Sequence, residues 1–106
     1  MITFRGNKIT SSGDYKSGYK LLTCERKYEA NPGYVSAEYY LIFRDNMNGI
    51  FYIAKKHSSK ILSIELDIRE DDIIYQSEKK SNVVRWIENN MEYNKQVERW
   101  IEKIIK

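Results

Sequence analysis

The stretch from Ser81 to Lys106, which reads SNVVRWIENNMEYNKQVERWIEKIIK, decides the C-terminal part of the fold. It contains an internal repeat, because the pattern VxRWIE begins at Val83 and again at Val97. In one continuous helix a spacing of two heptads returns to nearly the same face, with a drift of only about 40°. The sequence therefore predicts an amphipathic helical segment over 81–106, with Ser81 as its N-cap.

Two arrangements of this segment fit the sequence. A single long helix, which we favour, would align Trp86, Tyr93 and Trp100 in an aromatic stripe beside an aliphatic seam. Three poor helix formers nevertheless lie between or beside the repeats: Asn89, Asn90 and Asn94. The alternative is therefore two short helices with a break between them.

The residues before this segment predict an antiparallel, Tyr-rich sheet of about five strands. β-branched and aromatic residues are enriched in strands, and several runs alternate between apolar and polar residues. The expected strands are 2–5, 19–29, 34–44, 50–54 and 61–69, with a further short one over 73–76. Residues 39–43 are apolar on both alternating faces, so 34–44 is expected to be a central strand.

Turn signals separate these strands. Asn31-Pro32-Gly33 suits a type II turn, and Asn48-Gly49 suits the positive φ of a tight hairpin. Residues 10–14 are small and polar and are expected to form a loop, with regular structure resuming only near Tyr19. Residues 55–60 are expected to be a basic connection, and residues 70–72 an acidic turn.

The chain is expected to be a single α+β domain, 1–106, mainly β over 1–78 and helical over 81–106. Its 106 residues, 42% hydrophobic and 31% charged, suit one water-soluble core. No apolar run approaches the roughly 20 residues that span a bilayer, and the N-terminus lacks the layout of a signal peptide. We therefore expect a cytoplasmic protein with no membrane association.

Enzymatic and metal-binding chemistry has little support in the sequence. Cys24 is the only cysteine and His57 the only histidine, so neither an internal disulfide nor a zinc-ligand cluster is expected. No acid or nucleophile stands at a motif spacing from His57. We expect no catalytic residue, no metal and no cofactor.

The preferred hypothesis is a small non-catalytic protein-binding module, such as an inhibitor or accessory protein of a bacterium or phage. The richness in Ile, Lys, Asn and Tyr is typical of translation from an AT-rich genome, as in low-GC bacteria and their phages. Aromatic side chains concentrate binding energy at the centres of interfaces. The helical segment would bind a protein partner or a second copy of the chain through five residues: Arg85, Trp86, Tyr93, Arg99 and Trp100. The alternative is that its aromatic residues only pack on the sheet.

Nucleic-acid binding is the second hypothesis. Residues 1–60 carry a net charge of +5 and seven of the nine tyrosines, whereas residues 61–106 carry −2. Aromatic rings stack on bases and nearby cations contact phosphates. Eight residues of this half are the candidates: Lys20, Arg26, Lys27, Tyr28, Tyr34, Lys55, Lys56 and Lys60. Alternatively, the tyrosines simply suit strands and the lysines keep the surface solvated.

A remote third hypothesis is a magnesium-dependent nuclease. Asp67, Asp71 or Asp72 followed by Glu78-x-Lys80 resembles the Asp…Glu-x-Lys arrangement of PD-(D/E)xK nucleases. This resemblance implies that the carboxylates would hold Mg²⁺ near the lysine, and oxygen ligands do suit magnesium. The match covers three residues of a permissive motif.

Overall fold

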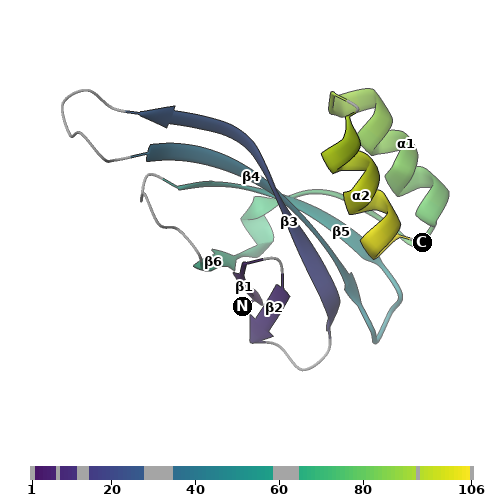
Figure 1. Ribbon diagram of the computed structural model, residues 1–106. Helices are drawn as coiled ribbons and strands as arrows, with labels where there is room; N and C mark the ends of the chain where they lie inside the picture. The colour runs from purple at the N-terminus through teal and green to yellow at the C-terminus, as the bar shows by residue number, and fades with distance from the viewer. Residues whose placement is uncertain are drawn as a thin grey trace.

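The structure combines two antiparallel sheets with a pair of helices, and the expected α+β class is confirmed (Figure 1). It is a computed structural model that describes residues 2–6, 8–11, 15–27, 35–58, 65–92 and 94–105. The predicted turn at Asn31-Pro32-Gly33 lies outside these residues.

Two sheets replace the single sheet of about five strands. The larger has the order β3-β4-β5-β7, and its strands are β3 (Tyr15–Lys27), β4 (Val35–Asp45), β5 (Phe51–Ser58) and β7 (Ile73–Ser77). The smaller has the order β2-β1-β6 and comprises β2 (Lys8–Ser11), β1 (Ile2–Arg5) and β6 (Glu65–Ile68). The expected number was too low because β2 was not predicted: residues 10 and 11, expected to begin a loop, belong to this strand. Alternation along a strand also does not reveal which strand pairs with it.

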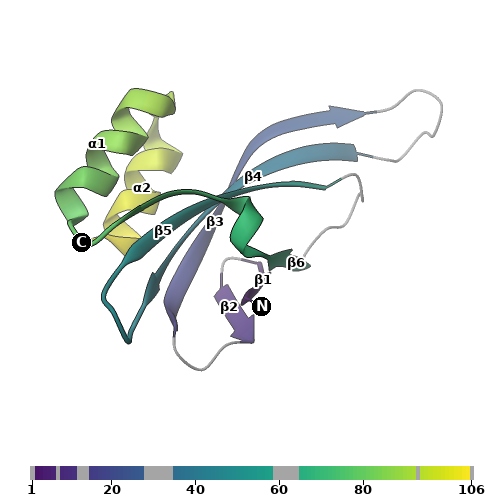
Figure 2. The same cartoon turned by 180° about the vertical axis from the view of Figure 1, so that it is seen from behind.

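The larger sheet is covered on both faces, as the sequence of β4 predicts. Leu41, Ile42 and Phe43 are all buried, although adjacent side chains of a strand point to opposite faces. Ile42 packs towards α1 (Lys80–Asn90) and α2 (Lys95–Ile104), whereas Leu41 and Phe43 pack towards the smaller sheet. Figures 1 and 2 show the helices on one side of the larger sheet and β1, β2 and β6 on the other.

The hairpin between β4 and β5 is confirmed. Gly49 has φ +73°, and its N–H donates to the carbonyl of Asp45 at 2.9 Å. The strand that follows is longer than expected, because residues 55–58 continue β5 rather than forming a connection. The expected alternation is also present in β6, where Leu66 and Ile68 are buried and their neighbours are exposed.

The strand β3 begins at Tyr15, earlier than the sequence suggests, and Gly18 lies within it. It is a buried residue inside β3, and its position coincides with an irregularity in the pairing with β4 between Lys16 and Tyr19. A Cβ at this position would lie 2.5 Å from the Phe4 ring and 2.8 Å from the Ile42 carbonyl oxygen. Glycine is required here for close packing of β1 against β3, and not for a turn.

The C-terminal segment forms two helices, so the favoured single helix is wrong and the alternative is confirmed. Met91 leaves the helical conformation (φ −126°, ψ 147°), and the Asn94 side chain accepts a hydrogen bond from the N–H of Val97 at 3.0 Å. Asn94 is thus the N-cap of α2. The N-cap of α1 is Lys79 rather than Ser81.

The helices are short. Among the residues that the structure describes, no helix has the length and apolar character needed to cross a membrane.

Candidate functional site

The two tryptophans of the repeat lie in different environments. Trp100 is fully buried, and its Nε1 donates a hydrogen bond to the carbonyl of Tyr19 at 3.1 Å. Trp86 is half-buried, stacks on Tyr75 with ring centroids 5.7 Å apart, and meets the edge of Tyr40 at 6.1 Å. Both residues therefore pack on the sheet.

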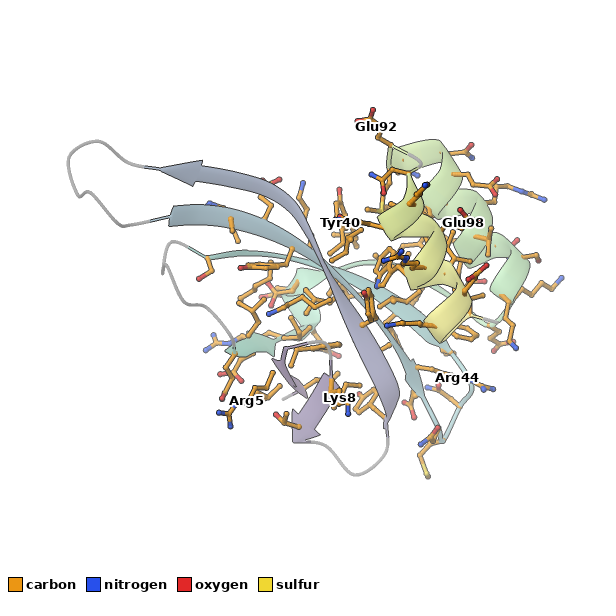
Figure 3. All side chains as sticks on the ribbon, in the orientation of Figure 1. Arg5, Lys8, Tyr40, Arg44, Glu92 and Glu98 are labelled. Atoms are coloured by element: carbon orange, nitrogen blue, oxygen red, sulfur yellow. The ribbon has the colours of Figure 1, made fainter. Side chains whose placement is uncertain are left out.

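The expected aromatic stripe does not form, because the helix breaks between the repeats. Arg85 and Arg99 are exposed, and Tyr93 lies outside the described residues. The two large hydrophobic side chains that are exposed in the described ranges, Met47 and Ile74, both lie outside α1 and α2. The described surface of the helices is polar, and Glu92 points away from the molecule at their junction (Figure 3).

The described lysines of the proposed nucleic-acid site contact groups of the chain itself. Lys55 Nζ lies 3.9 Å from a Glu38 carboxylate oxygen and 5.5 Å from the centre of the Tyr40 ring. Lys56 Nζ donates to the Asp72 carboxylate at 3.1 Å. These ion pairs reduce the positive charge available for phosphates.

Lys20 is the third described lysine of this set, and its Nζ lies 4.9 Å from the centre of the Tyr39 ring. Burial lowers the pKa of Lys20 below its ordinary value. The side chains of the other candidates lie outside the described part of the structure: Arg26, Lys27, Tyr28, Tyr34 and Lys60. Of the described members of this set, the structure thus places Lys20 and Lys55 on tyrosine rings and Lys56 beside Asp72.

Two carboxylates of the nuclease-like motif have hydrogen-bond partners within the chain. Asp67 accepts a hydrogen bond from Thr3 at 2.6 Å, and Asp72 accepts from the Arg69 N–H as well as from Lys56. Glu78 is exposed at the start of the helical region. Within the described ranges, no three His, Cys, Asp or Glu residues are grouped so that they could hold a metal ion.

A groove of about 400 Å³ is lined by residues of the α1–α2 junction and of the sheet, among them Tyr40, which is labelled in Figure 3. Its polar wall includes Asn90 and Asn94. The Asn90 amide donates to the carbonyl of Trp86 at 2.8 Å, and Asn94 caps α2. The side chains of Asn90 and Asn94 thus bind backbone groups at the ends of the helices. The groove therefore follows from the way in which the two helices are joined.

Two adjoining hollows lie on the face of the larger sheet that is turned away from the helices, and their linings combine aromatic, aliphatic and charged residues. The first, which we name the aromatic hollow, has a volume of about 320 Å³ and is lined by Tyr15, Phe43, Tyr52, Glu70, Ile73 and Gln76. The second, the aliphatic hollow, has about 340 Å³ and is lined by Ile2, Tyr15, Ile68, Arg69, Glu70 and Ile73. The two hollows share Tyr15, Glu70 and Ile73.

The rings of the aromatic hollow are held by the strand register. Phe43 and Tyr52 face each other across β4 and β5, and their rings stack with centroids 5.3 Å apart. Tyr15 meets Phe43 edge-on at 5.4 Å. Phe43 is buried and forms the floor, whereas the half-buried Tyr15 and Tyr52 form the walls.

Glu70 provides the charge of the aromatic hollow. It is the first residue of the 3-10 helix η1 (Glu70–Asp72) and is exposed. In contrast to Asp72, its carboxylate makes no hydrogen bond or ion pair with any residue that the structure describes. An unpaired carboxylate therefore stands at the rim of an aromatic surface.

The β4–β5 turn next to this hollow is held by side-chain hydrogen bonds and carries Met47, which is 79% exposed. Asp45 Oδ1 accepts from the Met47 N–H at 2.8 Å, and Asn48 Oδ1 accepts from the Ile50 N–H at 2.9 Å. Asn48 Nδ2 also donates to the hydroxyl of Tyr52 at 3.4 Å, which links the turn to the wall of the hollow. The position of Arg44 in Figure 3 marks this end of the sheet.

Sequence reasoning did not identify these residues as a site. Phe43 and Tyr52 flank the predicted turn symmetrically, which was a usable signal, but Tyr15 lies next to the stretch predicted to be a loop. Glu70 and Ile73 come from separate elements whose positions depend on the tertiary structure. No protein-family model, curated protein or solved structure matches the chain.

Proposed function

We propose that this protein is a non-catalytic protein-binding module that acts in the cytosol as a small accessory or inhibitory factor. The observation that supports the proposal is the aromatic hollow, which is open, partly apolar and held by paired strands. The contact surface differs from the one expected on the helices, because the described helix surface is polar.

The size and lining of the hollows favour side chains of a partner over a cofactor. Ligand sites commonly have volumes of about 300–1,000 Å³, so each hollow is at the lower end of that range. The lining of the aliphatic hollow is mainly apolar, whereas the aromatic hollow combines its rings with the polar groups of tyrosines, Glu70 and Gln76. Tyrosine and other aromatic residues are enriched at the centres of protein interfaces. Met47, on a turn held by side-chain hydrogen bonds, adds an exposed apolar contact.

Selection of random peptides displayed on phage against the immobilised protein tests this function. We expect enrichment of peptides whose binding is lost in Tyr52→Leu and kept in Tyr75→Leu. These variants are matched, because each tyrosine is half-buried on a strand and stacks on one aromatic ring, Phe43 or Trp86. Absence of enrichment, or equal loss in both variants when both are folded by circular dichroism, contradicts the proposal.

The nucleic-acid hypothesis has less support. Lys55 and Lys56 lie beside carboxylates, and burial disfavours the charged form of Lys20. A gel shift with single-stranded and double-stranded DNA and RNA at low salt compares the two functions directly. Retardation that weakens steeply with salt would favour nucleic acid over a protein partner.

A further inference from the structure

Several tyrosine rings of the larger sheet contact the charged nitrogen of a lysine. Three tyrosines already hold a lysine of this chain over the ring: Tyr19 with Lys103, Tyr39 with Lys20, and Tyr40 with Lys55. The nitrogen-to-centroid distances are 4.9 to 5.5 Å, within the range of cation–π attraction. Contact between a lysine and a tyrosine ring is therefore a recurring feature of this sheet.

Tyr52 differs from these three residues. Among the residues that the structure describes, no Lys or Arg lies over its ring. The charged group of its hollow is instead the unpaired carboxylate of Glu70. An aromatic surface beside a carboxylate has the electrostatic character that attracts a cation from outside the chain.

The charges around the hollow agree with this character. Asp71 follows Glu70 in η1 and is exposed, so a second carboxylate lies on the same short helix, although it does not line the hollow. Asp72, the third acidic residue, is occupied by Lys56. Arg69, which precedes η1, lines the aliphatic hollow but not the aromatic hollow.

We propose that the aromatic hollow binds a lysine or arginine side chain of the protein partner, and that the aliphatic hollow binds an aliphatic side chain of the same segment. The proposal rests on the protein-binding function above. The cation would lie against Tyr52 and Tyr15 near Glu70, while Ile2, Ile68 and Ile73 would contact the aliphatic side chain. The partner is thus expected to present a segment with one basic and one aliphatic residue.

A titration of the isolated protein with n-butylammonium, a model of the lysine side chain, tests this inference without the partner. We expect saturable changes in the ring NMR signals of Tyr52, and much smaller changes with pentanoate, an anion of similar length. Glu70→Gln should weaken the binding of butylammonium about threefold, as expected for an exposed charge pair. Glu102→Gln, an exposed glutamate on α2, is the matched control and should change nothing.

The outcomes separate this inference from the proposed function. Equal responses to both probes, or a Glu70→Gln variant that binds like the parent, would overturn the inference. Displayed peptides that depend on Tyr52 but lack Lys and Arg would also overturn it, and they would leave the protein-binding function supported. Peptides rich in Lys or Arg that lose binding in Glu70→Gln would support both.

Discussion

Replacement of Gly18 by alanine gives the sharpest test of how the two sheets fit together. The added Cβ would stand 2.5 Å from two atoms of the Phe4 ring and 2.8 Å from the Ile42 carbonyl oxygen. Real contacts of a Cβ are longer, so a neighbour has to move. The Phe4 ring is fully buried, and Ile42 belongs to the central strand β4, so neither neighbour can move freely.

The size of the effect follows from two opposing terms. Overpacking a filled core costs about 1–3 kcal/mol, and we expect the upper end because one contact is with backbone. Alanine also restricts the unfolded chain, which offsets about 0.4–1 kcal/mol. The free energy of unfolding should therefore fall by about 2 kcal/mol, which lowers the Tm of a domain of this size by about 8–16 °C.

Urea denaturation of Gly18→Ala, Phe4→Leu and the double variant measures this effect. The double variant should show a coupling of about 1 kcal/mol or more, because the smaller leucine makes room for the Cβ. Gly6→Ala is the control: it meets nothing within 4 Å, so its cost of about 1–2 kcal/mol should arise from φ +61° alone and be independent of Phe4. A loss below about 0.5 kcal/mol in Gly18→Ala, or purely additive effects, would refute the reasoning.

Two further predictions concern the helix pair and pH. Asn94→Ala should lower the free energy of unfolding in urea by about 0.5–2 kcal/mol, because it leaves the Val97 N–H without its cap, whereas Asn89→Ala on the exposed end of α1 should not. Lys20 has a lowered pKa in the folded state, so the unfolded chain binds more protons between that value and 10.5. The stability of the parent relative to Lys20→Met should therefore rise as pH increases through this interval, and a flat or falling difference would contradict the direction of the shift.

The sequence predicted elements whose residues carry the signal locally. The central position of β4 follows from apolar residues on both faces, and its hairpin follows from Asn48-Gly49. The pairing of β1 with β6 has no such local signal, because the two strands lie far apart in the sequence. The same limitation applies to the aromatic hollow, whose walls come from β3, β4, β5, η1 and β7.

The repeat in the helices was ambiguous for a physical reason. A spacing of two heptads places residues on the same face of one helix, but it also suits two helices that pack in the same way on one sheet. Val83 and Val97 are both buried, as are Ile87 and Ile101, so the two copies use the same apolar positions. Trp86 and Trp100 nevertheless differ, because only Trp100 reaches the backbone of β3.

The hydrogen bond from Trp100 to Tyr19 joins residues that are 81 positions apart, and this separation constrains how the protein folds during synthesis. Leu21, Ile42 and Phe51 share a core with Val97, Trp100 and Ile101, so the sheet lacks part of its cover until α2 has been synthesised. A nascent chain that stops after α1 would expose these apolar residues. The emerging sheet is therefore prone to aggregate until α2 packs on it.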